Sequence, residues 1–242
     1  SSVDRDREEV EFQQDPGTNR FTTLSASTGA IMEHGPNQRF RASFTYSQRA
    51  PSVEQLYAFG RHGAAGTFEV GDPDLNTEAF SNFEVGFEQH RGELRFDVTA
   101  FYNRADDFTF FQFVPDDEGN PRRVDAEGEP DEDGELLVFN DQEDVHFYGL
   151  ELGSERDFQA GALPVTLRLS GDFLRGRLRD GGNLPRMTPP RLSLGVDTQW
   201  QNFDLSLDAQ QVFRQTWTGE AETATGSYHL LGFDAGWKPA SV

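Results

Sequence analysis

Apolar and polar residues alternate along most of this chain. From Arg39 to Ser47, an aromatic or alanine side chain occupies every second position, and polar side chains occupy the positions between. The stretch from Asn82 to Glu88 repeats the pattern with two phenylalanines and a valine. A two-residue period of this kind predicts β-strands that have one apolar face and one polar face.

Further alternating stretches follow in both directions. The period is weak at residues 21–31 and clear at 94–103, 145–155, 165–173, 192–200, 203–209 and 231–237. A short alternating piece at Val10 and Phe12 indicates a loop or the end of a strand. Together these stretches predict about nine or ten strands.

The predicted connections alternate between short and long. Short turns are expected at Gly35, Gly92, Gly161 and Asn202, and long loops at residues 48–80, 106–144, 179–189 and 216–226. This alternation is typical of outer-membrane barrels, which have short periplasmic turns and long external loops. The predicted fold class is therefore all-β, an antiparallel up-and-down meander of about ten strands.

Composition supports a sheet that faces lipid. Only 35% of the residues are hydrophobic, which is little for a large core, yet the chain contains 22 phenylalanines in alternating stretches. Aromatic residues near the strand ends, such as Trp200 and Phe203 at one edge and Tyr102, Phe108, Phe110 and Phe113 at the other, fit two interfacial girdles. No apolar run approaches the roughly 18 residues that a membrane-spanning helix needs.

Charge limits the possible partners. The formal charge is −21, so a nucleic-acid partner is excluded by repulsion and cationic ligands are favoured. A solvated acidic surface explains most of this charge. Much of it lies between Pro115 and Glu143, where we expect a long, exposed loop. The chain contains no cysteine, so any metal would need His, Asp or Glu ligands.

Two motifs flank the first long loop. One is Arg49-Ala50-Pro51, and the other runs Gly71-Asp72-Pro73-Asp74-Leu75 and ends at Glu78. With the later Tyr102-Asn103-Arg104 and Gly149-Leu150-Glu151 blocks, they resemble the hallmarks of TonB-dependent outer-membrane receptors. The resemblance implies a Gram-negative outer membrane, contact with its lipid, and a barrel of about 22 strands. It also implies contact with the TonB complex through an N-terminal plug.

The resemblance covers only the later part of such a receptor. We expect residues 1–242 to form a partial barrel domain, without the plug, the first barrel strands and the last strands. The expected function is energy-coupled transport of a scarce metal or a metal chelate, in which this chain supplies wall strands and external, ligand-capturing loops. On its own the chain should form an open sheet whose first and last strands do not pair.

The loop from Glu54 to Gly71 is similar to a subgroup associated with zinc uptake. Its run Tyr57-Ala-Phe-Gly-Arg-His62 and its Thr67-Phe-Glu69-Val-Gly end carry this likeness. His62 is the expected metal ligand, with Glu54 or Glu69 beside it, since an imidazole and a carboxylate suit Zn²⁺. Zinc would be a transported ligand, and no resident cofactor is expected. The alternative is that His62 is an ordinary polar loop residue.

The sequence also bears on other functions. No nucleophile elbow, phosphate-binding loop or His-Glu-x-x-His motif occurs, so we expect no enzymatic activity. The main alternative is a self-contained outer-membrane barrel of about ten strands, acting as a hydrolase or an adhesin. A soluble acidic β-protein that binds a ligand is the third possibility.

Overall fold

The computed structural model describes residues 18–116, 118–220 and 222–238, and the predicted piece at Val10 and Phe12 lies outside them. The chain folds into two compact units. Among the described residues, the loop unit comprises those of 18–23, Gln48–Glu78 and 107–143, and the sheet unit comprises those of Leu24–Ser47, Ala79–Asp106 and 144–238. No helix in the described part of the chain has the length and apolarity needed to cross a membrane.

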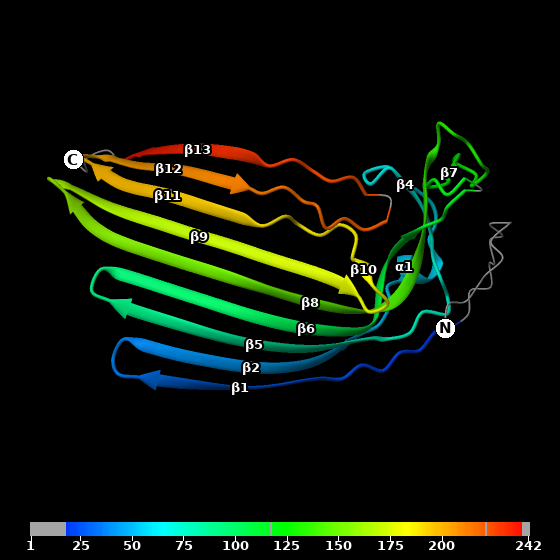
Figure 1. The fold of residues 1–242 in the computed structure, drawn as a ribbon, viewed down its shortest axis with the longest axis horizontal. Helices are drawn as coiled ribbons and strands as arrows, with labels where there is room; N and C mark the ends of the chain where they lie inside the picture. The colour runs from blue at the N-terminus through cyan, green and yellow to red at the C-terminus, as the bar shows by residue number, and fades with distance from the viewer. Residues whose placement is uncertain (1–17, 117, 221, 239–242) are drawn as a thin grey trace. The chain divides into compact units, whose positions relative to one another are not determined.

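Nine long strands form an antiparallel meander, as the alternating pattern predicts (Figure 1). They are β1 (Ser25–His34), β2 (Gln38–Arg49), β5 (Glu78–Arg91), β6 (Leu94–Phe113), β8 (Glu135–Ala160), β9 (Leu163–Leu178), β11 (Arg191–Trp200), β12 (Phe203–Val212) and β13 (Tyr228–Trp237). Each strand pairs with the next in this order. Among the described residues β1 and β13 are not paired with each other, so the sheet is open and the expected open edge is confirmed.

Short elements complete the list. They are α1 (Val53–Tyr57), β3 (Phe59–His62), β4 (Thr67–Val70), β7 (Arg123–Val124) and β10 (Gly182–Asn183). In the loop unit β3 pairs with β4, and β4 runs parallel to the start of β8. The β10 strand pairs with the end of β9 in the sheet unit.

The four short turns lie where the sequence predicts them, at the left-hand end of the sheet in Figure 1. Gly35, Gly92 and Gly161 have φ of 67°, 59° and 66°, and Gln201 has φ of 55°. Tight hairpins require this left-handed backbone, which glycine adopts without steric cost. These turns fix the register of their hairpins and therefore the face to which each side chain points.

The sheet unit has a polar face crossed by ion pairs. Arg41 on β2 contacts Glu88 on β5 and donates to Thr99 Oγ1 on β6 at 2.5 Å. It crosses β5 at Gly86, where an added Cβ would lie 2.5 Å from the Arg41 Nε. Glycine at this position therefore lets one guanidinium reach two neighbouring strands.

The same arrangement recurs further along the sheet. Arg168 on β9 donates to Asp197 on β11 at 2.5 Å and to Asp208 on β12 at 3.0 Å. It crosses β11 at Gly195, where a Cβ would lie 2.7 Å from Asp208 Oδ1 and 2.8 Å from Arg168 Cζ. The polar face is thus held by arginines that lie across glycines.

The opposite, apolar face of the sheet unit is exposed. Phe44, Leu194, Leu207 and Phe233 have 43%, 45%, 54% and 66% of their surface accessible. At the short-turn end, Trp200, Phe203 and Trp237 stand opposite one another on β11, β12 and β13. This row matches the girdle predicted for that edge.

The second girdle differs in part from the prediction. Tyr102 belongs to it, together with Tyr148, Phe173 and Trp217. Phe108, Phe110 and Phe113 do not, because they lie in the part of β6 that belongs to the loop unit, where they are half-buried. The distance between the two girdles can be estimated on β8, where Tyr148 belongs to the second girdle and Phe158 lies near the short-turn end. These two residues are ten positions apart, which is about 34 Å along the strand and about 25 Å along the normal of a tilted barrel wall.

The loop unit has a core of its own, which the sequence patterns did not predict. Phe68, Val114, Val124 and Leu137 form a buried cluster, and the Phe59 ring packs edge-on against Phe68 at 5.1 Å. The expected exposed loop from Pro115 to Glu143 is therefore wrong in part. Residues 135–143 continue β8, and Val124 and Leu137 are 1% exposed.

Candidate functional site

The two hallmark motifs meet in an ion pair in the loop unit. Glu78, 1% exposed, receives two hydrogen bonds from the Arg49 guanidinium, one of them from NH2 at 2.8 Å. It also accepts the backbone N–H of Thr109 at 2.8 Å. A buried carboxylate is stable only when its oxygens are paired in this way. The pair joins the end of β2 to the start of β5 across the first long loop.

The glycine of the second motif sits against α1. A Cβ on Gly71 would lie 2.5 Å from the backbone nitrogen of Tyr57. The Gly71 N–H donates to Ala58 O at 2.7 Å, and the Asp72 N–H donates to Gln55 O at 2.9 Å. Glycine is therefore required by close backbone contact, and α1 itself is started by a capping box at Ser52.

The other hallmark residues fill or close the same loop. Pro51 and Leu75 are buried, Ala50 is half-buried, and the Pro73 carbonyl accepts from the Asn19 side chain at 3.2 Å. These motifs thus shape the loop. Among the described residues, the charged hallmark side chains of Arg49 and Glu78 pair with each other and are not directed at a ligand.

Gln142 is a further loop-shaping residue that the sequence reading did not identify. Its Nε2 donates to the carbonyls of Asn76 and Asp107 at 2.9 and 2.8 Å, and its Oε1 accepts the Asn76 N–H at 2.8 Å. One amide side chain thereby joins the segment before β5, the middle of β6 and β8. The role of Gln142 follows from its position opposite the Leu-x-x-Glu motif in space. The spacing of residues along the chain does not reveal this position, because Asn76 and Gln142 are 66 residues apart.

The structure brings His62 and Glu69 together. His62 Nδ1 lies 2.8 Å from Glu69 Oε1 across the β3–β4 hairpin, and Thr67 Oγ1 donates to the same carboxylate oxygen at 3.1 Å. The His62 side chain is 58% exposed, so its other ring nitrogen can face a ligand. Imidazole and carboxylate are a pair that divalent metals accept.

Glu54 does not join this pair. It lies in the first turn of α1, and its pKa is lowered by hydrogen bonds from its own backbone and from Ser52. Within the described part of the chain, no three His, Asp or Glu side chains gather as a metal site would require. His62 and Glu69 therefore amount to half of a closed zinc site, which has four ligands.

An ion pair supports the hairpin that carries His62. Arg61 NH2 donates to Glu135 Oε1 at 2.9 Å. This contact raises the pKa of Arg61 and lowers the pKa of Glu135. Both groups are charged at neutral pH, and the pair ties β3 to the start of β8.

Comparison with known proteins decides the family. Residues 2–242 match the model of the TonB-dependent receptor-like β-barrel. The chain belongs to this family. Similar solved structures include the copper transporter OprC, at 14% identity and a TM-score of 0.70, with 89% of this chain and 31% of that chain covered.

Two further structures similar to this receptor barrel have comparable coverage. They are the siderophore receptor PirA from Pseudomonas aeruginosa, with 17% identity, TM-score 0.56 and coverage of 88% and 36%, and the ferric yersiniabactin uptake receptor FyuA from Yersinia pestis, with 15%, 0.54, and 88% and 29%. The chain thus spans about a third of the length of these structures. At these identities the likeness shows the fold.

The polar face of this receptor barrel is acidic. Where the nine long strands run through the described residues of the sheet unit, they carry twelve carboxylates and five arginines in the polar phase. The carboxylates are Glu33, Glu84, Glu88, Asp97, Glu151, Glu155, Asp157, Asp172, Asp197, Asp204, Asp208 and Asp234, and the arginines are Arg39, Arg41, Arg95, Arg168 and Arg191. The excess of carboxylates favours positively charged groups along this face.

Two further histidines, His146 and His229, stand apart from the His62 pair. His146 is on the apolar face of the receptor barrel, with its Nδ1 2.6 Å from the Tyr102 hydroxyl. His229 is on β13, in the same phase as Leu231 and Phe233. Neither residue shares the polar face, so we assign no cargo contact to them.

Proposed function

We propose that the receptor of which this chain is a part imports a scarce metal ion or a metal chelate across the outer membrane of a Gram-negative bacterium. The observation that carries the proposal is the two-faced antiparallel sheet, apolar on one side and ion-paired on the other, in a member of the TonB-dependent receptor family. The apolar face would contact lipid, and the polar face would line the interior.

In this proposal residues 1–242 are one part of a larger barrel domain. Strands beyond the open edges at β1 and β13 would complete the wall, because unpaired backbone groups in the hydrocarbon region are costly. A plug domain from the same receptor would fill the interior and transmit energy from the TonB complex. The loop unit would be external and would help to capture the cargo.

The charge of the polar face bears on the cargo. An interior with more carboxylates than arginines favours a cationic ion or complex over an anionic one. Copper, siderophores and ferric yersiniabactin are the cargoes named for the similar structures, and they are properties of those proteins. For this receptor we propose zinc as the cargo, because His62 and Glu69 form a pair that Zn²⁺ accepts.

Zinc capture would need ligands from outside this chain, because two side chains do not complete a site. We expect the isolated chain to bind Zn²⁺ weakly. In the whole receptor, the remaining ligands would come from the plug or from other external loops. Glu54 would contribute only if the loop changed shape when the metal bound.

The proposal is tested by uptake in cells that carry the full-length receptor. Accumulation of Zn²⁺, Cu²⁺ and ferric chelates would be measured with and without TonB, together with binding to the purified receptor. A His62→Ala, Glu69→Gln double variant should lower zinc affinity at least tenfold, since each lost ligand removes a bond to the metal. His34→Ala, at a short turn, is the matched control. TonB-independent accumulation of every ligand would contradict the transport proposal, and unchanged zinc affinity would contradict the role of the pair.

A further inference from the structure

Arginines gather on the apolar face of the sheet unit, at the end away from the short turns. Arg175 and Arg177 are in the same strand phase as Leu169 and Phe173 on β9, and Arg104 is in the same phase as Tyr102 on β6. Arg179 directly follows β9. We call Arg104, Arg175, Arg177 and Arg179 the arginine patch.

Contacts join the patch across three strands. Asp144 Oδ2 lies 3.8 Å from Arg104 NH2 and 2.8 Å from Arg179 NH1. Arg177 stands opposite His146 in the β8–β9 register, and Arg175 stands opposite Tyr148. The patch carries a net positive charge even when Asp106, Asp144 and Asp180 are counted, in a chain whose formal charge is −21.

The patch begins where the second aromatic girdle ends. Phe173 packs edge-on against Trp217 at 5.7 Å, and the Arg175 guanidinium lies 4.5 Å from the centre of the same indole ring. Arg175 and Arg177 follow Phe173 by two and four residues, which is about 7 and 14 Å along the strand. In a tilted strand they lie at headgroup depth, just outside the hydrocarbon.

The arginines keep unused hydrogen-bonding capacity. Within the described ranges, Arg177 is exposed and makes no side-chain hydrogen bond or ion pair. Arg175 is half-buried, donates from NH2 to Asn183 Oδ1 at 3.3 Å and has a buried Nε, so only the end of its guanidinium can meet a ligand. Arg104 also pairs with Asp106, at 2.6 Å. The Arg104 and Arg179 side chains are 51% and 65% exposed. Donors of this kind pair well with phosphate oxygens.

We propose that the arginine patch binds the phosphate groups of phosphorylated glycolipids in the leaflet next to the external loops. Trp217 and Tyr148 would pack against the acyl chains, and the guanidinium groups would hold the phosphates above them. The occupant is a lipid because the patch adjoins the apolar face and not the polar one. The inference rests on the proposed membrane location and is independent of the cargo.

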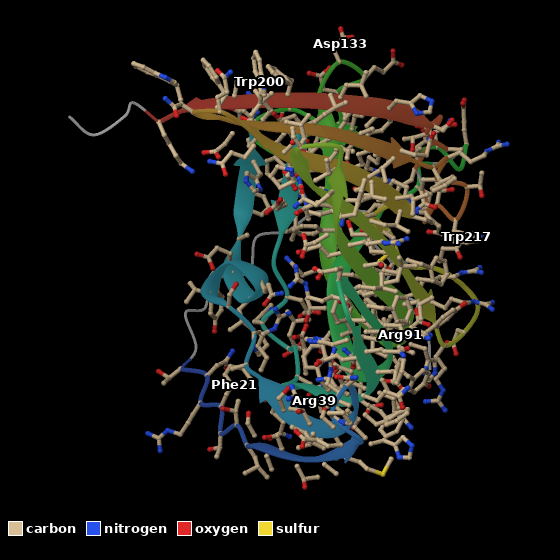
Figure 2. The ribbon with its side chains drawn as sticks, turned by 90° about the vertical axis from the view of Figure 1, so that its left-hand side faces the viewer. Phe21, Arg39, Arg91, Asp133, Trp200 and Trp217 are labelled. Atoms are coloured by element: carbon tan, nitrogen blue, oxygen red, sulfur yellow. The ribbon has the colours of Figure 1, made fainter. Side chains whose placement is uncertain are left out.

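The test uses the full-length receptor in detergent and diphosphorylated lipid A as the probe. Bound lipid would be counted by native mass spectrometry during titration. An Arg175→Gln, Arg177→Gln double variant should lower the affinity about tenfold or more, because each surface arginine contributes severalfold to binding of anionic lipid. Arg91→Gln is the matched control, since Arg91 is on the same face at the short-turn end. Arg91 and Trp217 are both on the right-hand side of the sheet in Figure 2.

Each outcome decides the proposal. Loss of binding in the double variant, with binding kept by Arg91→Gln and largely restored by lysine at both positions, supports it. Equal loss in both variants, equal affinity for lipid A without phosphates, or competition by inorganic phosphate at similar concentration overturns it. Heat-modifiable mobility of each variant shows that the barrel is folded. Cargo uptake measured in the same variants should be unchanged, so failure of the transport proposal would be seen separately.

Discussion

The loop unit and the sheet unit of this receptor barrel are stabilised by different means. Among the residues that the structure describes, every strongly exposed large hydrophobic residue except Val53 lies in the sheet unit. The loop unit instead buries Phe68, Leu137 and Val138 to 1% exposure or less. One unit is packed like a small globular protein, and the other exposes its apolar side chains on one face.

This difference shows where each unit obtains its stability. A buried cluster and a buried ion pair hold the loop unit from within. The sheet unit has hydrogen-bonded strands and polar-face ion pairs, and in the proposed membrane location its apolar face would gain stability from surrounding lipid. Mutations should therefore act through packing in the first unit and through solvent or lipid contact in the second.

The largest effect is expected from Phe68→Ala in the loop unit. Removing this fully buried ring should cost about 3 to 5 kcal/mol of local stability, because the cavity lies against Val124 and Leu137. Hydrogen exchange of residues 107–143 in the full-length receptor measures this cost. Val53→Ala, at a side chain 71% exposed, is the control. If both variants exchanged alike, the loop unit would have no core of its own.

The sheet unit is tested by placing a charge on each face in turn. Phe44→Arg should cost about 2 to 4 kcal/mol near the middle of the bilayer, and Thr45→Arg, one residue further on, should cost much less. Folding titrations of the full-length barrel into bilayers measure both. Asp208→Arg is unsuitable as a polar-face control, since it would place a second guanidinium against Arg168. Equal costs at positions 44 and 45 would refute the assignment of the faces.

Glu78→Gln tests the hallmark ion pair. The neutral amide keeps the shape of the side chain but removes the charge that Arg49 pairs with, so the loop unit should lose about 1.5 to 3 kcal/mol. Protease resistance of the segment 49–78 reports the loss. Glu132→Gln, at an exposed carboxylate of the same unit, should leave the segment intact. A stable, protease-resistant Glu78→Gln variant would mean that the hallmark does not hold the loop.

Strand alternation was enough to predict the sheet unit. All nine long strands and all four short turns occur where the two-residue period and the turn residues indicate them. The period works there because successive side chains of a strand point to opposite faces, and here one face carries apolar side chains and the other polar ones.

The loop unit obeys other rules, which explains what the sequence did not reveal. Phe68, Val124 and Leu137 are far apart along the chain, and no period links them, so their cluster could not be predicted. The candidate site was predicted only in part, because local contacts can be inferred from the sequence and long-range contacts cannot. His62 and Glu69 meet because they share a hairpin, whereas the pairing of Gln142 with Asn76 depends on long-range contacts.

The smallest effect concerns the glycines of the polar face. Gly195→Ala would place a Cβ 2.7 Å from Asp208 Oδ1 and 2.8 Å from Arg168 Cζ, so the guanidinium could no longer lie across β11. Overpacking and the loss of the contact to Asp208 should together cost about 1 to 2 kcal/mol in the folding titration. Gly232→Ala is the matched control on β13, where the nearest atom, Asp208 Cβ, would be at 3.9 Å. A restoring effect of Asp208→Ala in the Gly195→Ala background would trace the cost to this crossing, since the side chain in closest conflict would be gone. If Gly195→Ala and Gly232→Ala were equally neutral, the arginine crossings would add nothing, and the polar face would be held by backbone pairing alone.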